Sequence, residues 1–226
     1  MPATVSVRSG LGQETLAERA AIALRQMVHD GILLPGQPIR QGAIADRLGI
    51  SRVPVREALK NLQADGLVTA SPSGGFVVAR LSSEELSQIY LMRRLLETEL
   101  LSRITDVPES VLAGLFELNA RMAALVDEPT RELRALNEEF HFQMFALSGL
   151  GHVVSETARL WSKTAPYRLV YSAGRDARAR IVAEHDNLAR ALRADDTALL
   201  VRLMDEHRRT SEQSVVSVLS HPIDSL

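Results

Sequence analysis

Three histidines lie in the helix-patterned second half of the sequence, at His141, His185 and His207. Asn137 precedes His141 by four residues, which places both side chains on one face of a helix. Neutral imidazole nitrogens and an amide oxygen suit a divalent transition metal ion, such as zinc or nickel. If the four side chains converge inside a helical bundle, they predict a metal centre with positions open to water or a ligand. Taken singly, each of these histidines is more often a hydrogen-bonded structural residue.

A second pattern is a basic stripe in residues 51–65. Arg52, Arg56 and Lys60 recur every four residues along one helical face. The opposite face is apolar and is formed by Val55, Ala58, Leu59 and Leu62. On a recognition helix the N-terminal residues enter the major groove of DNA, where an arginine can bond O6 and N7 of a guanine together. An ordinary solvated basic face would show the same spacing, so spacing alone leaves both interpretations open.

The stripe suggests a division of roles if this helix reads DNA. We expect Arg52 and Arg56 to contact base edges and Lys60, further along the helix, to contact a phosphate. Ser51 precedes the helix as its capping residue, and the helix N-terminus can add another phosphate contact.

Elements before and after the stripe complete a small domain. Helical spacing predicts a first helix over residues 14–30, and a second, short one marked by Ile44, Ala45 and Leu48. The third helix runs from Ser51 to about residue 65. Two apolar runs, 67–70 and 76–79, then predict a hairpin whose tip, Gly74-Gly75, lets the backbone approach a groove or phosphate closely. This order is that of a winged helix-turn-helix.

The rest of the chain shows no further strand pattern. Six amphipathic segments follow a short linker at residues 80–82, and they predict helices over 83–105, 109–127, 130–148, 151–172, 175–194 and 196–219. We therefore predict a mainly α protein with a winged helix-turn-helix domain over residues 1–80 and an all-α bundle of six helices over residues 81–226.

Composition narrows the possible chemistry. The chain has no cysteine, so disulfides, thiolate metal sites and cysteine nucleophiles are excluded. Residues 1–80 carry nine Lys and Arg against six Asp and Glu, whereas residues 81–226 carry 17 against 22. A basic N-terminal domain on an acidic body is compatible with a polyanion partner for that domain alone. Without a signal-peptide pattern in residues 1–12 or an apolar run of about 20 residues, we expect a cytoplasmic protein that does not cross a membrane.

Several segments of the N-terminal domain closely resemble the GntR-family DNA-binding domain, over roughly residues 14–80. They are Pro35-Gly36, the run from Ala45 to Leu59, Gly66-Leu67-Val68 and Gly75-Phe76-Val77. The resemblance implies a winged helix-turn-helix that binds palindromic operators as a dimer, with Arg52 and Arg56 reading bases and the wing in the minor groove. The sequence departs from some relatives at Gln41-Gly42, where they carry a base-contacting arginine, so its operator can differ there.

The C-terminal part, about residues 83–219, resembles the FCD ligand-binding domain of the FadR subfamily, and its six helices suggest the VanR-like branch. The matching stretches are residues 93–97, 137–141 with Ser148-Gly149, Glu184-His185 and residues 204–207. The resemblance implies that Asn137, His141, His185 and His207 hold a metal ion, although a neutral amide binds a dication less strongly than the Asp of most relatives.

The same resemblance implies an effector. In such relatives the ion and nearby cations hold the carboxylate of a small organic acid, and Arg93 and Arg168 are the candidate cations here. A salt bridge accounts equally well for Arg93 and more readily for Arg168. We assign Trp161 and the phenylalanines around His141 to the core.

The sequence therefore predicts a ligand-responsive DNA-binding regulator, acting as a repressor and a homodimer, rather than an enzyme. Two alternatives remain at this stage. One is a metalloenzyme that uses the histidine cluster, although no nucleophile elbow, phosphate loop or HExxH motif is present. The other is an architectural DNA binder whose helical body only dimerises.

Overall fold

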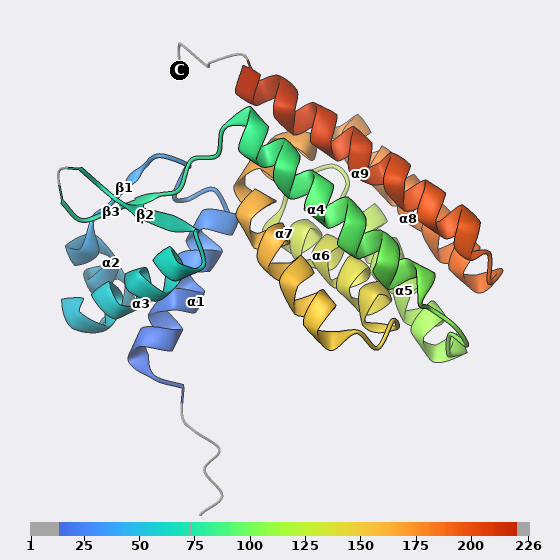
Figure 1. The fold of residues 1–226 in the computed structure, drawn as a ribbon, viewed down its shortest axis with the longest axis horizontal. Coiled ribbons are helices and arrows are strands. Elements are labelled where there is room, and N and C mark those ends of the chain that lie inside the picture. Colours follow the sequence, from blue (N-terminus) through green and yellow to red (C-terminus); the bar gives the residue numbers. More distant parts are fainter. Residues whose placement is uncertain (1–13, 73, 221–226) are drawn as a thin grey trace, which may run out of the picture.

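A computed structural model describes residues 14–220 except Ser73, and in it a small N-terminal unit sits at one end of a helical bundle (Figure 1). We call residues 14–80 the head and residues 81–220 the body. Within these described residues, no helix is long and apolar enough to cross a membrane.

The head combines three helices with a small antiparallel sheet. Its elements are α1 (Leu16–His29), β1 (Pro38–Ile39), α2 (Gln41–Leu48), α3 (Arg52–Ala64), β2 (Val68–Ala70) and β3 (Phe76–Val78). Helix α1 begins with a capping box, because the Thr15 hydroxyl accepts a bond from the Glu18 amide while the Glu18 carboxylate accepts one from the Thr15 amide. The predicted hairpin is confirmed as β2 paired antiparallel with β3.

The head also differs from the sequence-based expectation in detail. Strand β1 was not predicted, and it pairs with β3 to make a three-stranded sheet in the order β1-β3-β2. Two residues are too short for any periodicity to reveal a strand. Ser51 occupies the N-cap position of α3, but its side chain makes no capping hydrogen bond. Helix α2 begins at Gln41, three residues before the apolar positions that indicated it.

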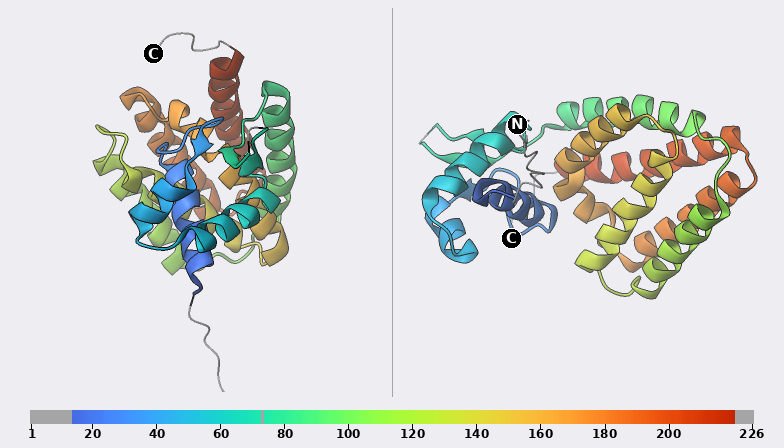
Figure 2. Two further views of the ribbon diagram at one scale, coloured as in Figure 1. Left: turned by 90° about the vertical axis from the view of Figure 1, so that its left-hand side faces the viewer. Right: turned by 90° about the horizontal axis from the view of Figure 1, so that it is seen from below.

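The body contains the six predicted helices within the described residues. They are α4 (Ser83–Ser102), α5 (Glu109–Ala124), α6 (Arg131–Ala146), α7 (Gly151–Tyr171), α8 (Arg175–Arg193) and α9 (Thr197–Ser220). Several of the predicted helices run up to three residues beyond the observed ends. The residues that follow the last helical turn form caps and turns, and they continue the apolar pattern that indicated the helix. Figure 2 shows α4 and α9 running alongside each other, while α5 packs on α6 and α8.

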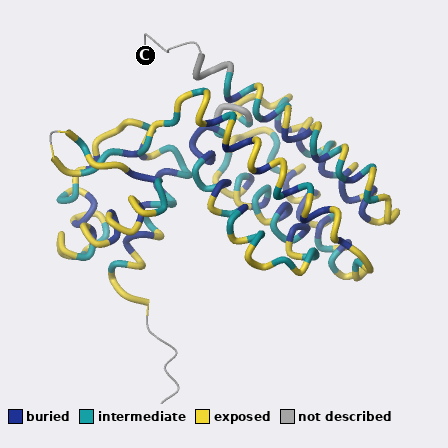
Figure 3. Tube along the Cα trace, in the orientation of Figure 1, coloured by how far each residue is buried: buried dark blue, intermediate teal, exposed yellow. Residues whose placement is uncertain are grey.

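Each part has its own apolar interior. The head's core joins residues of α1, α2 and α3 to the sheet, and the body's larger core joins residues of all six of its helices. The buried stretches in Figure 3 accordingly form one stripe along each helix, facing its neighbours. On α3 the buried residues are those predicted from the sequence: Val55, Ala58, Leu59 and Leu62.

Helix α1 is the part of the head that packs against the body, on α7 (Figures 1 and 2). Gly31, just beyond the end of α1, has a φ of +71°, and a Cβ atom there would lie 2.8 Å from Cδ1 of Leu169. The positive φ favours glycine at this position, and a larger residue would also have to displace the Leu169 side chain. Near the linker, the Leu81 amide donates a hydrogen bond of 2.7 Å to the Tyr167 hydroxyl. The packing of α1 on α7 is thus one place where the head meets the body.

Candidate metal centre, ligand cavity and DNA-binding face

The three helical histidines meet inside the body, each coming from a different helix. His141 on α6, His185 on α8 and His207 on α9 are all buried, and their ligand atoms all lie within 4.8 Å of one another. Nε2 of His141 and Nε2 of His185 are 3.2 Å apart. The rings also pack on aromatic side chains, with His185 stacked on Phe140. The convergence that sequence spacing could not establish is present.

The chemistry of this cluster fits a metal ion. Two nitrogens that each lie about 2.0–2.1 Å from one ion are separated by roughly 3.0–3.4 Å, and the observed 3.2 Å falls in that range. Burial, followed by the charges of neighbouring groups, lowers the pKa of His141 and of His185 well below the usual value. The imidazoles are therefore neutral, which is the form that coordinates metals. The Nδ1 atoms of both rings have no hydrogen-bond partner among the described residues, so internal hydrogen bonds do little to offset their burial.

His207 has a carboxylate partner that the sequence did not reveal. Its Nδ1 lies 2.6 Å from Oε2 of Glu184 on the neighbouring helix α8. A carboxylate on one ring nitrogen fixes the tautomer and orients the other nitrogen toward a metal. Glu184 immediately precedes His185 in the sequence and therefore points about 100° away from it around α8. It reaches instead to a histidine on another helix.

A cavity of about 510 Å³ adjoins the cluster. Asn137, one turn before His141 on α6, lines it together with His207 and Arg93. Asn137 is half-buried. The cavity has the size of a small-molecule site.

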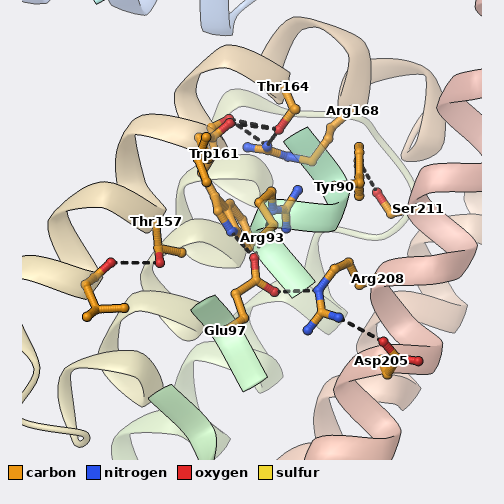
Figure 4. Close-up of polar contacts among 12 residues, drawn as sticks. Tyr90, Arg93, Glu97, Thr157, Trp161, Thr164, Arg168, Asp205, Arg208 and Ser211 are labelled. Atoms are coloured by element: carbon orange, nitrogen blue, oxygen red, sulfur yellow. Dashed lines mark hydrogen bonds and ion pairs between the residues drawn. The ribbon is translucent and has the colours of Figure 1, made fainter. Parts of the chain in front are cut away.

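One wall of the cavity rests on a buried charged network (Figure 4). The Glu97 carboxylate accepts hydrogen bonds of 2.8 Å from Nε of Arg93, Nε of Arg208 and Nε1 of Trp161. Burial alone would raise the pKa of Glu97, but the charges and hydrogen bonds of the two arginines outweigh it and lower the pKa to about 2. Arg93 therefore forms a salt bridge with Glu97 within α4, one of the two roles expected from the sequence, and it also lines the cavity.

Two residues of this wall have contacts that the sequence did not indicate. Trp161 is buried in the core, as expected, but it also lines the cavity and carries the guanidinium groups of Arg93 and Arg168 over its ring. For Arg168 a salt bridge was the favoured explanation, yet no ion pair of Arg168 is found among the described residues. Its Nη1 instead donates to the Trp161 carbonyl and the Thr164 hydroxyl, and burial, more than any neighbouring charge, lowers the pKa of Arg168 to about 10. Arg168 also lines the cavity.

The basic stripe lies on the outer face of the head. Arg52, Arg56 and Lys60 are exposed on α3, while Val55, Ala58, Leu59 and Leu62 of the same helix are buried. Val53, beside Arg52 at the start of α3, is 66 % exposed although it is apolar. Gly42 on α2 lies under Arg52, because a Cβ there would sit 3.1 Å from Nη2 of that arginine. The departure at Gln41-Gly42 therefore leaves room for the Arg52 side chain.

The wing follows α3 on the same head. Gly74 and Gly75 are exposed between β2 and β3, with φ values of +88° and +84°. Such values favour glycine, so the backbone at this tip is free of side chains. A helix with an exposed basic face beside a glycine-tipped hairpin, joined to a helical body with a ligand cavity, defines a winged helix-turn-helix DNA-binding regulator.

Comparison with known families agrees with this class and identifies the family. Residues 16–78 match the family described as bacterial regulatory proteins, gntR family, and residues 88–210 match the FCD domain. The chain belongs to the gntR family of bacterial regulatory proteins and carries an FCD domain. The family and the relatives are transcriptional regulators rather than enzymes, so the metalloenzyme alternative has no support.

Individual relatives are similar over most of the chain. A regulator from Streptomyces ambofaciens, described as an HTH-type transcriptional regulator in an unstable DNA locus, is 27% identical over 200 residues, covering 88% of this chain and 85% of its own. The gluconate operon transcriptional repressor of Bacillus subtilis is 24% identical over 208 residues, covering 87% and 84%. A solved structure of a GntR regulator from a Rhodococcus species superposes with a TM-score of 0.77 at 22% identity, over 89% of this chain and 97% of that one. The last likeness shows a shared fold.

Proposed function

We propose that this chain is a cytoplasmic transcriptional repressor that binds a near-palindromic operator as a homodimer and changes its DNA affinity when a small organic acid binds beside a metal ion. In this proposal residues 1–80 form the DNA-binding domain and residues 81–226 the effector-binding and dimerisation domain. The observation that carries the proposal is the cluster of three buried histidines beside an arginine-lined cavity, one wall of which comes from the DNA-binding head.

The metal ligands in the proposal are Asn137, His141, His185 and His207, with zinc or nickel as the ion. A bound dication would supply a positive centre for a carboxylate oxygen. Glu184 holds His207 in place through Nδ1.

The ligand's second anchor is Arg93. Glu97 fixes its Nε, while its Nη1 has no hydrogen-bond partner among the described residues and can bind a second oxygen of the ligand. Arg168 adds a positive charge to the cavity wall.

Metal content tests this part of the proposal. Wild-type protein dialysed against Zn²⁺ is expected to retain one ion per chain, and His141→Ala is expected to lose it. His152→Ala is the matched control, because His152 is an exposed histidine outside the cluster. A His141→Ala protein that keeps one ion per chain would contradict the assignment.

On DNA, Arg52 and Arg56 take base-edge roles, and Ser51, Lys60 and the wing glycines Gly74 and Gly75 lie where phosphates or the minor groove would be. Replacing Arg52 or Arg56 with alanine is expected to weaken operator binding by about 1–3 kcal/mol and to relax the preferred base at one position. The control is Arg190→Ala, an exposed arginine of α8 in the body. Unchanged affinity in both head variants would refute the assignment.

Helix α4 offers a face for the homodimer. Leu91, Met92 and Leu95 are 47%, 43% and 58% exposed, and their spacing places them in one stripe along the helix. An exposed apolar stripe of this kind is typical of a protein interface, and a second copy of the chain would supply a matching stripe. Leu95→Glu is therefore expected to give monomers in sedimentation velocity, while Glu99→Gln stays dimeric. A dimeric Leu95→Glu protein would place the interface elsewhere.

A thermal-shift experiment separates this proposal from a purely architectural DNA binder. A sensor gains stability from its specific ligand by mass action, and a dimerisation module does not. Acetate, L-lactate, succinate and D-gluconate form a first panel, the last because a relative is named as a gluconate operon repressor. No stabilisation by any of them in the zinc-loaded protein would count against small carboxylates as effectors.

A further inference from the structure

The cavity beside the histidine cluster is walled by both parts of the protein. Helix α1 of the head contributes Ile22, Arg25, Gln26, His29 and Asp30 to its lining, which also includes His207 and Arg93 of the body. A ligand in this space would therefore lie against the DNA-binding head itself. No change in the packing of the bundle is required for the head to meet the ligand.

Asp30, the C-cap residue of α1, is tied to the body by two ion pairs. It caps the C-terminus of α1, where the helix dipole disfavours a negative charge, and its side chain is only 12% exposed. Two arginines of α6 compensate that charge: Arg134 lies 3.3 Å and Arg131 3.4 Å from the Asp30 oxygens. Gln26 on the same helix donates a third contact of 3.0 Å. The carboxylate of the head is thus held in place by cations of the body.

The cavity attracts anions. Among the described residues that line it, seven are arginines and three are acidic. Both Arg93 and Arg208 have one guanidinium nitrogen that is buried and without a hydrogen-bond partner in the described part of the chain. Arg131 and Arg134 belong to the same lining, so an anion in the cavity and the Asp30 carboxylate share these two cations.

We propose that an anionic ligand in the cavity acts on the head directly, by competing with Asp30 for Arg134 and Arg131 and so releasing α1 from α6. This inference rests on the proposed function, in which the cavity binds a small carboxylate. The ligand's negative charge repels the Asp30 carboxylate and attracts the two arginines that held it. The head then pivots on its remaining contacts with α7, and the operator-binding surfaces of the two heads in the proposed homodimer lose their fixed spacing.

Removal of the Asp30 charge should reproduce the effect of the ligand. The absence of cysteine allows two spin labels to be attached at chosen sites, Gln63→Cys on α3 and Glu117→Cys on α5, both exposed. In the labelled wild type without ligand, pulsed electron resonance is expected to give a narrow head-to-body distance distribution. Asp30→Asn is expected to broaden it, and Arg134→Gln should do the same from the other side of the contact.

Asp127→Asn provides the matched control. Asp127 makes an exposed ion pair of 2.8 Å with Arg175 inside the body, so the same change of charge there should leave the distances unchanged. If Asp30→Asn and Arg134→Gln both keep the narrow wild-type distribution, the ion pair does not hold the head and the inference is wrong.

The ligand arm uses zinc-loaded protein with acetate, L-lactate, succinate or D-gluconate. A carboxylate that raises the melting temperature is expected to broaden the wild-type distances and to change operator affinity by about tenfold, within the usual range of allosteric coupling. The same carboxylate should still bind the Asp30→Asn variant, but it should change that variant's operator affinity by less than about twofold. If no carboxylate stabilises the protein, the proposed function fails and this inference with it. If one stabilises it while Asp30→Asn keeps the full wild-type response, only the present inference fails.

Discussion

Replacement of Glu97 by glutamine tests whether the arginine wall of the cavity depends on a single buried carboxylate. Glu97 has no exposed surface, and its two arginine partners are 4% and 3% exposed. The substitution keeps the size of the side chain but removes its charge. Two guanidinium groups would then share a dry site with only a neutral amide between them, at a cost of several kcal/mol.

The magnitude follows from two independent lines. Loss of one partner from a buried ion pair costs about 3–5 kcal/mol. The pKa of Glu97, lowered from 4.5 to about 2, corresponds to roughly 3 kcal/mol of preferential stabilisation of the charged form. Because the folded-state pKa is the lower one, this contribution is fully present above pH 4.5 and is lost as pH falls through 2. It is therefore intact at pH 7.

The assay is urea unfolding at pH 7, followed by circular dichroism. Glu97→Gln is expected to lose about 3 kcal/mol. Glu99→Gln is the control on the same helix: its ion pair with Arg103 is 2.7 Å long but about half exposed on both sides, so the expected loss is below about 1 kcal/mol. If Glu97→Gln unfolds within 1 kcal/mol of wild type, the reasoning about the buried network is refuted.

Three further predictions concern other parts of the protein. Glu184→Gln should weaken zinc binding about 10- to 100-fold, because the carboxylate that orients His207 is lost. Glu206→Gln, at an exposed position, should leave zinc binding unchanged. Equal zinc affinity in the two variants, measured by competition with a chelator, would contradict the role of Glu184. Gly42→Ala should lower operator affinity by up to about tenfold in a binding titration without lowering stability, since the added Cβ forces the Arg52 guanidinium to shift by a few tenths of an ångström. Unchanged affinity would show that Arg52 does not need its present position. Burial, aided by nearby arginine charges, lowers the pKa of His29 to about 4, so this residue destabilises the fold as pH falls below 6.5. The contribution of His29 alone to stability should drop by about 2 kcal/mol between pH 7 and pH 5, besides the losses from His141 and His185, and His29→Gln should remove that part of the drop in urea titrations.

Much of the architecture could be predicted from the sequence, because its signals are local. The apolar face of α3 and the breaks between the body helices follow from a period of 3.6 residues and from glycine and proline positions. Strand β1, two residues long, has no such signal. Its pairing with β3 depends on contacts between residues far apart in the chain.

The candidate site could be predicted only in part. Histidine spacing and a family resemblance indicated His141, His185 and His207, and the structure brings them together. Glu184 and Trp161 were missed for the same physical reason: the partner of each lies on another helix, and helical periodicity within one segment carries no information about that neighbour. The contribution of α1 to the cavity is likewise a property of how the head packs on the body.

The most direct test of the central claim is the operator affinity of the zinc-loaded wild type, measured by fluorescence anisotropy with and without a carboxylate that raises its melting temperature. The carboxylate is expected to change Kd by about 5- to 150-fold, and this change should disappear in His141→Ala. If the operator Kd stays the same while the carboxylate still stabilises the protein, the proposed function is contradicted, because ligand binding in the cavity would then have no effect on DNA binding by the head.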